Sequence, residues 1–311
     1  MTKILIVGAF GYGNLGDEAI RDIELKIFSE FGEVKWDSPD MDREKVDWAD
    51  VIVIGGGGLL YDSPPHRPWT GPDPHPNVEN YMRYADEAIK HNKTLIFFCI
   101  GEQGIHHPYT VKRYREVLNQ ADHISVRDPE DAAILYSLGI DRDVLVAGDP
   151  AFLYTPRVFH SPEKIGAVPT MNSPLHPAYR KADELFTFSQ RDDQNVLKVY
   201  RSAKMWTRSA QEFVDHATSW KAASSGRFHG IVLCMTAGVP VVFWRFGHGK
   251  VAKLARKYDW PYAIRKGESP VQKLEEILND RAMAVRYTSH VVNTERRLVE
   301  GAIDDVRKIL K

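Results

Sequence analysis

Short apolar runs alternate with amphipathic segments along the first half of the chain. The predicted strands cover residues 3–10, 32–38, 51–54, 94–101, 123–128 and 144–152, and most of them are runs of Ile, Leu, Val and Phe. Between them, apolar residues recur at helical spacing in 17–31, 81–91, 111–120 and 129–138. Strands that alternate with helices predict a parallel sheet covered by helices on both faces.

The same alternation restarts after a proline-rich, irregular stretch at 154–185, where we place a domain boundary. Apolar patterns beyond this stretch predict several further strands, one of them at 196–200. They also predict several helices, including one at 228–237 and a long final helix at about 289–310. The pattern therefore predicts an α/β protein built from two Rossmann-like, doubly wound domains that face a cleft.

The two domains and the final helix divide the chain into three predicted segments. The first domain covers 1–155 and is the expected acceptor side, and the second covers 156–288. The helix at 289–311 is expected to cross back to the first domain. Ligands of such sheets bind beyond the carboxyl ends of the strands, so the chemically informative residues should follow strands.

Composition excludes several classes of protein. The 41 Lys and Arg nearly balance 42 Asp and Glu, which gives a formal net charge of -1 and no basic footprint for nucleic acid. Cys99 and Cys234 lie in apolar runs, without disulfide or metal spacing, so we expect buried thiols and a reducing compartment. No run reaches the ~18 apolar residues of a membrane span. We therefore expect a cytoplasmic protein without a metal, and its oligomeric state stays open.

A glycine-rich turn follows the first predicted strand. Gly11, Gly13 and Gly16 match G-x-G-x-x-G, a spacing that brings main-chain N–H groups close to a ligand at a helix N-terminus. With Asp37 after the second strand, the motif also permits a nicotinamide dinucleotide. However, Asp17 and Glu18 open the helix, and they would repel a pyrophosphate. They are better suited to sugar hydroxyls, or to capping the helix by favouring its dipole.

Two further segments follow strands of the first domain. The glycines at 55–58 are expected to bring the backbone of Gly56, Gly57 and Gly58 close to a ligand. Gln103 lies in GEQG, which ends the neighbouring strand and adds main-chain donors. In the long loop after the glycines, Trp69 could stack on a sugar face.

An arginine follows the strand at 123–128. The guanidinium group of Arg127 is suited to bidentate binding of a carboxylate or a phosphate. The alternative is a local arrangement, either a pair with Asp128 or a helix cap.

The segment SSGRFHG carries the strongest chemical pattern in the second domain. Ser224 or Ser225 could cap the apolar helix that follows, and Gly226 permits an unusual turn. Arg227 and His229 then lie at the positive end of that helix, where an anion is favoured. A histidine beside a bound anion can act as a general acid.

These motifs occur in an order that resembles the polysaccharide pyruvyl transferase family. GNLGDEAI, GGGGLLYD, GEQG, SVRDPEDAAILYSLGI, GDPAFL and SGRFHGIVLCMTAGVPVVFW carry the resemblance, broadly over 1–152 and again over 224–253. It implies a fold similar to two-domain glycosyltransferases of the GT-B type. It also implies transfer of the enolpyruvate unit of phosphoenolpyruvate to two hydroxyls of a sugar, which gives a cyclic ketal and phosphate.

The resemblance also implies roles for individual residues. Arg127, Arg227 and Phe228 match phosphoenolpyruvate-binding positions of the family, His229 matches the proposed acid, and Lys250 falls where the family often has a lysine near the phosphate. The second domain is then the phosphoenolpyruvate side. Two arginines, one from each domain, would each hold one anionic group.

The sugar-binding residues are less closely defined. We expect Asp17 or Glu18 to be the base, and Gly13, Asn14, Gly16, Gly56, Gly57, Gly58 and Gln103 to line the substrate. Phosphoenolpyruvate is then a donor substrate and no cofactor is implied. The acceptor sugar is lipid-linked, a free oligosaccharide or a small metabolite.

Three other functions stay open on the sequence alone. A nucleotide-sugar-dependent glycosyltransferase would place its diphosphate at the helix after Gly226. A nicotinamide-dependent oxidoreductase would use the G-x-G-x-x-G turn, but it leaves SGRFHG unexplained. A non-catalytic relative would bind a sugar or an anion without turnover. Stabilisation by a nucleoside diphosphate and not by phosphoenolpyruvate would favour the glycosyltransferase, and a shift in melting with NAD(H) would favour the oxidoreductase. Ligand binding without turnover would favour the non-catalytic relative.

Overall fold

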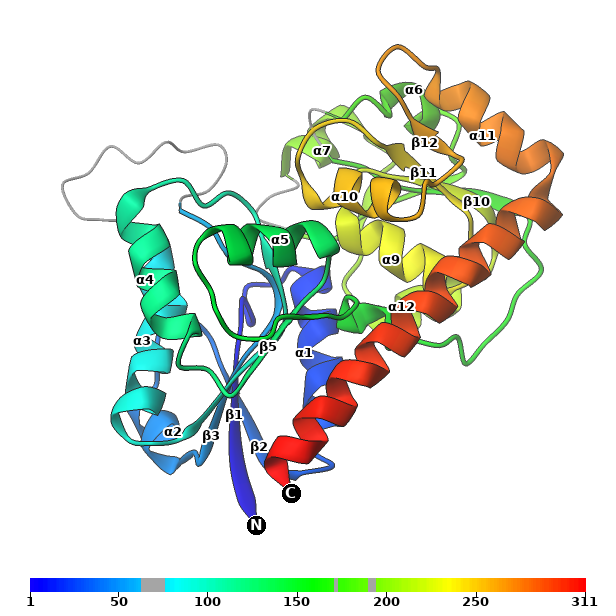
Figure 1. Ribbon diagram of the computed structural model, residues 1–311. Coiled ribbons are helices and arrows are strands. Elements are labelled where there is room, and N and C mark those ends of the chain that lie inside the picture. The colour runs from blue at the N-terminus through cyan, green and yellow to red at the C-terminus, as the bar shows by residue number, and fades with distance from the viewer. Residues whose placement is uncertain (63–75, 171–172, 190–193) are drawn as a thin grey trace. The chain divides into compact units, whose positions relative to one another are not determined.

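The protein is described by a computed structural model that covers residues 1–62, 76–170, 173–189 and 194–311. It divides into two compact units, which are described separately below. Unit 1 contains residues 1–12, 20–150 and 297–311, and unit 2 contains residues 13–19 and 151–296. Within the described ranges each unit is built on one parallel six-stranded sheet with flanking helices, which confirms the predicted pair of Rossmann-like domains (Figure 1).

Unit 1 has the strand order β2-β1-β3-β4-β5-β6, with every pair parallel. Its strands are β1 (Thr2–Val7), β2 (Gly32–Asp37), β3 (Val51–Leu60), β4 (Thr94–Glu102), β5 (His123–Val126) and β6 (Leu145–Val146). Its helices are α2 (Arg43–Trp48), α3 (Pro76–Lys90), α4 (Pro108–Leu118) and α5 (Pro129–Ser137), together with most of α1 (Leu15–Phe28) and the end of α12 (Arg281–Leu310).

Alternation of side chains along the central strands builds the core of unit 1. Leu5, Ile52 and Phe97 belong to one buried cluster with residues of α3, α4 and α5. Phe98, the next residue of β4, points to the other face of the sheet. There its ring packs edge-on against the ring of Phe28, with 5.3 Å between the ring centroids. Burial on both faces explains why these strands are continuous apolar runs.

Unit 2 has the strand order β12-β11-β10-β7-β8-β9, again with every pair parallel. Its strands are β7 (Lys164–Val168), β8 (Glu184–Thr187), β9 (Lys204–Met205), β10 (Trp220–Ser225), β11 (Val241–Trp244) and β12 (Ala263–Ile264). Its helices are η1 (Pro150–Leu153, which begins at the unit boundary), α6 (His176–Tyr179), α7 (Gln194–Val199), α8 (Ala210–Ala217), α9 (Phe228–Thr236), α10 (Lys250–Lys257) and α11 (Pro270–Asn279), with the first half of α12.

One predicted strand of unit 2 is wrong. Residues 196–200 lie in and just after helix α7, not in a strand. Val196 and Tyr200 are both buried, one helical turn apart, and Tyr200 N donates to Val196 O at 2.8 Å, whereas Val199 is 55% exposed. The apolar residues therefore follow helical spacing, which a five-residue run could not distinguish from a strand.

The extent of the two domains and their roles as acceptor and donor sides stay predictions. The final helix is longer than expected, because α12 begins at Arg281 directly after α11. Among the described residues, no helix is both long enough and apolar enough to cross a membrane.

Candidate functional site

The strand orders identify where each sheet is expected to bind a ligand. In unit 2 the chain proceeds from β7 outward to β8 and β9, and later from β10 outward to β11 and β12, so the order reverses between β7 and β10. In unit 1 it reverses between β1 and β3. Loops at such switch points open outward at the carboxyl ends of the strands and leave room for a ligand. The glycine-rich turn after β1 and the Arg227–His229 segment after β10 follow strands at these two points, whereas the glycines at 55–58 lie within β3.

In unit 2, the turn after β10 is held by Ser225 and Gly226. Ser225 Oγ accepts from Arg227 N at 3.1 Å and donates to Arg227 O at 2.9 Å, and Gly226 N donates to Val168 O at 3.1 Å. A side chain at Gly226 would overlap Thr170 and the buried ring of Tyr179. The expectation that Ser224 or Ser225 caps α9 is wrong: both end strand β10, and Arg227 is the N-cap residue, without a side-chain capping bond.

This turn places three predicted residues at the start of α9. Phe228 and His229 are buried, with 8% and 6% of their surfaces exposed, and Arg227 is half-buried. Lys250, the first residue of α10, lies with its Nζ 5.6 Å from the centre of the Phe228 ring. The described part of unit 2 therefore gathers two cationic side chains and an imidazole at the positive end of an apolar helix.

The first residues of α1 belong to the same unit and lie against His229. Leu15 N donates to Phe188 O at 3.0 Å, and Asn14 forms a β-bridge with Ser189. Asn14 Oδ1 accepts from Gly16 N at 3.1 Å and so caps the helix. A methyl group on Gly16 would overlap the His229 ring. The structure thus brings Gly16, and with it the following Asp17 and Glu18, to the segment that carries His229.

The glycines at 55–58 make room for the protein's own side chains. They lie within β3, which continues to Leu60 and does not end at residue 54 as predicted. Gly56 has φ +44°, and a Cβ there would overlap Ile20 and Glu24. Gln103 occupies the space beside Gly58, and its Nε2 donates to Gly58 O at 2.5 Å. Gly57, with φ +93°, has no atom within 3.5 Å of the position of a Cβ. The close approaches seen at Gly56 and Gly58 are therefore internal, and a ligand contact there stays a prediction.

A buried ionic cluster lies behind these glycines. Arg127 Nη1 pairs with Asp149 Oδ2 at 2.9 Å, with side chains only 6% and 1% exposed, and Gly101 leaves space for the guanidinium group. Asp128, not Arg127, caps α5, through its bond from Glu130 N. Glu24 is fully buried, and its pKa is raised well above the ordinary value, first by burial and then by repulsion from Asp149.

Three functional candidates were missed by sequence reasoning. Glu24 occupies a position on the buried face of α1 between Ile20 and Ile27, so a carboxyl group in an apolar helical stripe was the available signal. Asp149 lies in the GDPAF segment, and the only signal for it in the sequence was that this segment carries part of the family resemblance. Lys253, 5% exposed and one turn after Lys250 on α10, could have been found from their i, i+3 spacing.

Asp37, the acidic residue that a nicotinamide dinucleotide would need, has its carboxylate bonded to neighbouring groups. Asp37 Oδ2 accepts from Asp42 N and from Tyr84 Oη, each at 2.7 Å, and Lys45 lies 3.3 Å from Oδ1. Burial opposes ionisation, yet these three groups lower the pKa of Asp37. The carboxylate that would bind a ribose is already bonded to its own unit.

The predicted stacking residue Trp69 lies outside the described residues.

Solved structures share this architecture at low sequence identity. An α-glucosyltransferase in complex with UDP is 10% identical, with both chains covered in full and a TM-score of 0.53. A UDP-GlcNAc 2-epimerase from Neisseria meningitidis is 10% identical over 99% of this chain and 100% of its own, with a TM-score of 0.55. An uncharacterized protein from Klebsiella pneumoniae is 15% identical over 85% of this chain and 92% of its own, with a TM-score of 0.52. A search of curated proteins gives no match.

These likenesses define the class of fold, the two-domain Rossmann-like arrangement of GT-B glycosyltransferases and related epimerases. The family comes from the sequence. The model of the polysaccharide pyruvyl transferase family matches residues 14–244, which is more than half of the chain, and the protein belongs to that family. It is therefore a polysaccharide-modifying transferase. The match begins at Asn14 and includes Arg127 and the Arg227–His229 segment.

Proposed function

We propose that the protein transfers the enolpyruvyl carbons of phosphoenolpyruvate to two hydroxyls of one sugar, giving a cyclic pyruvyl ketal and inorganic phosphate. A proton adds to the methylene carbon and leaves a cationic centre at C2. Two sugar oxygens bond to C2, the C2–O bond to phosphate breaks, and the two hydroxyl protons leave. One proton replaces the proton used in the first step, and the other leaves with the phosphate.

The observation that carries this proposal is the group of charges at the start of α9. Arg227 and Lys250 lie at a helix N-terminus that has no side-chain cap, at the switch point of the unit 2 sheet. The helix dipole and both cations favour an anion there. Phosphoenolpyruvate carries two anionic groups, a phosphate and a carboxylate, which is the ligand chemistry that such a site selects.

His229 is the proposed general acid. Its ring packs on Gly16, so its orientation is fixed by a contact that admits no larger residue. In the protonated form it would donate to the methylene carbon of phosphoenolpyruvate. Asp17 or Glu18, in the first turn of α1, is the proposed base for an attacking hydroxyl. We assign Arg127 to one of the two anionic groups of the donor, with Asp149 as the residue that positions its guanidinium group.

The acceptor is proposed as a sugar of a polysaccharide, oligosaccharide or glycolipid precursor, either lipid-linked or free. Ketal formation requires two hydroxyls that one carbon can bridge, such as the 4- and 6-hydroxyls of a hexopyranoside. The polar side chains of Asn14 and Gln103 are the proposed hydrogen-bonding partners of the sugar.

Binding of the donor tests the proposal without knowledge of the acceptor. Isothermal titration of phosphoenolpyruvate into the wild-type protein should show one saturable site, which Arg227→Ala weakens by about 10- to 100-fold because a charge-assisted contact is lost. Arg208→Ala is the matched control, since Arg208 is an exposed arginine of the same unit. Binding of UDP in place of phosphoenolpyruvate would favour a nucleotide-sugar-dependent glycosyltransferase and contradict the proposal.

Turnover tests the role of His229. With methyl galactoside or methyl glucoside as acceptor, wild-type protein should release phosphate and add one pyruvyl ketal to the sugar, detected by mass spectrometry. His229→Ala should reduce the rate by about 10²- to 10⁴-fold, the usual contribution of a general acid. His216→Ala is the control, because His216 pairs with Glu184 elsewhere in unit 2. Equal rates in both variants would remove His229 from the mechanism.

A further inference from the structure

A cavity in unit 1 lies at the amino ends of the strands, at the end of the sheet opposite to Arg127. It has a volume of ≈ 660 Å³ and is lined by the first residues of β5 and β6, the segment 141–144 and the last turns of α12. His123 and Leu145 begin their strands, so the cavity opens at the amino ends of β5 and β6. Arg127 follows the carboxyl end of β5. The cavity is therefore separate from the proposed catalytic residues, and its volume is typical of small-molecule sites.

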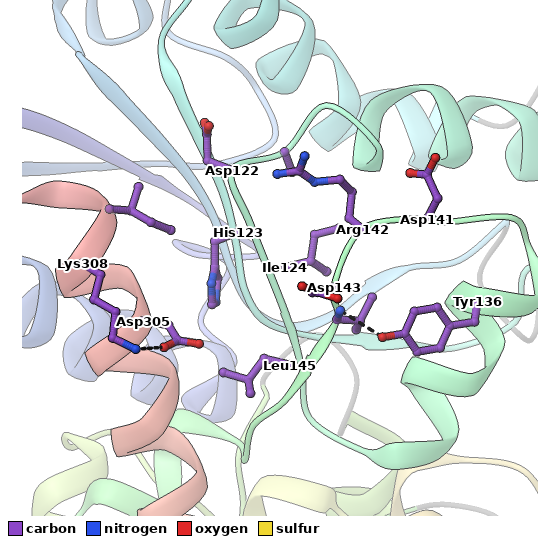
Figure 2. Close-up of a pocket in the computed structure, with 13 residues that line it drawn as sticks. Asp122, His123, Ile124, Tyr136, Asp141, Arg142, Asp143, Leu145, Asp305 and Lys308 are labelled. Carbon is purple, nitrogen blue, oxygen red and sulfur yellow. Dashed lines mark hydrogen bonds and ion pairs between the residues drawn. The ribbon is translucent and has the colours of Figure 1, made fainter.

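A buried imidazole faces this cavity. His123 is 8% exposed, and its Nε2 has no hydrogen-bond partner among the described residues. Figure 2 shows its ring pointing toward the end of α12, where Asp305 and Lys308 lie. Ile124, the next residue of β5, also lines the cavity and belongs to the apolar core. A buried polar atom without a partner is unfavourable, and a bound ligand that supplies the hydrogen bond would remove that penalty.

The lining is acidic. It contains the carboxylates of Asp122, Asp141, Asp143 and Asp305 against the cations of Arg142 and Lys308, a formal excess of two negative charges. Two of these carboxylates have partners in the protein. Asp122 accepts a hydrogen bond from Leu95 N at 2.8 Å, and Asp305 accepts one from Lys308 Nζ at 2.6 Å. Among the residues that the structure describes, Asp143 has no side-chain hydrogen bond or ion pair, and it lies across the cavity from α12 (Figure 2). The field in the cavity therefore favours a cation over an anion.

The state of His123 agrees with that preference. Burial lowers its pKa to about 4, although the nearby Asp305 acts in the opposite direction, so the ring is neutral near pH 7. In the tautomer with its proton on Nδ1, the neutral ring presents Nε2 as an acceptor. Tyr136, 51% exposed, adds an aromatic ring to the wall while its Oη accepts from Val144 N at 3.1 Å. Aromatic faces attract organic cations.

We propose that this cavity binds a small organic cation that carries an ammonium group. Asp143 and Asp305 form ion pairs with the cation, and His123 Nε2 accepts a hydrogen bond from it. A metal ion is a poorer occupant, because no group of three or more His, Cys, Asp or Glu side chains is placed to hold one within the described ranges. The volume also exceeds what one ion fills. The inference rests on unit 1 alone and is independent of the proposed transferase chemistry.

Spermidine is the probe for a direct test. Isothermal titration at moderate ionic strength should show one saturable site in the wild-type protein, with Asp143→Asn and Asp305→Asn each lowering affinity at least tenfold. Asp304→Asn is the matched control, because Asp304 is the neighbouring carboxylate of α12, pairs with Arg307 and does not line the cavity. Equal binding by Asp304→Asn and Asp305→Asn, or no saturable binding by the wild type, would overturn the proposal.

A second measurement uses the wild-type protein, so it does not depend on whether a variant folds. In a carbon-resolved proton spectrum, the ring signals of His123 should shift on addition of spermidine, while those of His229 should not. Glucose, which is neutral, and inorganic phosphate, which is an anion, should leave the His123 signals in place. A shift with phosphate in place of spermidine would contradict the assigned charge. Titration of phosphoenolpyruvate in the Asp143→Asn variant should match the wild type, which separates this site from the proposed function.

Discussion

Each unit has one switch point, at the carboxyl ends of its strands, yet the two switch points carry opposite chemistry. In unit 1 the space beside the glycines of β3 is taken by the protein's own groups, among them the buried carboxyl of Glu24 and the amide of Gln103. In unit 2 the turn beyond β10 leads to Arg227, His229 and Lys250 at an uncapped helix start. The fold thus supplies the location, and the side chains decide which ligand charge is accepted there.

The comparison also separates two uses of arginine. Arg127 in unit 1 is buried against Asp149, which fixes its orientation and offsets part of its charge. Arg227 in unit 2 is half-buried, and its main chain, rather than its side chain, is fixed by Ser225. Glycines serve both designs by making room for side chains, Gly101 for Arg127 and Gly16 for His229. Four substitutions can break or sharpen this comparison.

The largest effect is expected from breaking the buried pair of unit 1. Asp149→Ala leaves the Arg127 guanidinium group buried without this carboxylate, and we expect the free energy of unfolding to fall by about 3–5 kcal/mol. Urea denaturation measures it. The control is Glu116→Ala, which removes an exposed partner of Lys112 on α4 and should cost less than about 0.5 kcal/mol. Similar losses of unfolding free energy in both variants would show that the buried Arg127–Asp149 pair contributes no more than an exposed ion pair.

The next effect concerns activity in unit 2. Gly16→Ala places a methyl group where the His229 ring lies, so the ring must move, and a displacement of about 1 Å can lower turnover about 100-fold. Phosphate release from phosphoenolpyruvate and acceptor is the measurement. Gly267→Ala is the control: Gly267 lies in the same unit outside the proposed site, and its φ is +91°, but no atom lies within 4 Å of its Cβ position. It should cost about 1 kcal/mol of stability through backbone strain and leave turnover unchanged. Unchanged turnover in Gly16→Ala would separate this contact from catalysis.

A smaller effect is expected at the glycines of unit 1. Gly56→Ala combines a positive φ with overlap of Ile20 and Glu24, and it should lower the free energy of unfolding by about 2 kcal/mol. Gly57→Ala has the positive φ alone, since its nearest neighbours lie at 3.8 Å, and should cost about half as much. Thermal denaturation compares the two. If Gly57→Ala proved the more damaging, internal packing would not be the reason for the glycines at 55–58.

The last prediction concerns the pH dependence of stability contributed by Glu24. Its pKa is raised in the folded protein, so the unfolded chain loses its proton first as pH rises. Stability should therefore decline from the ordinary glutamate range of about 4.3 upward until the folded pKa is reached, by at most about 1.4 kcal/mol per pH unit. Glu24→Gln keeps the neutral shape and should remove this decline. Denaturation of both proteins between pH 5 and 8 tests the sign, and parallel curves would show that Glu24 is ionised in the folded state.

Local patterns in the sequence predicted most of the fold. β4, α5 and α9 have boundaries close to those expected, because burial on one or both faces repeats at the strand or helix period. The exceptions are short or small-residue elements. The stretch at 196–200 is helical, and β10 was missed because Ala222, Ala223 and the two following serines lack the β-branched residues of a typical strand.

Taken alone, the sequence determined the α/β class, the two Rossmann-like halves and the segments that carry chemistry, because hydrophobic period, glycines and charged residues are local properties of the chain. Only the tertiary structure decided that WKAASS is a central strand, paired with β7 and β11, since its neighbours supply the hydrogen bonds that its composition does not favour. Only strand order and packing placed Gly16 against His229 and Asp149 against Arg127. Such contacts join residues far apart in sequence, and no local period encodes which of them meet.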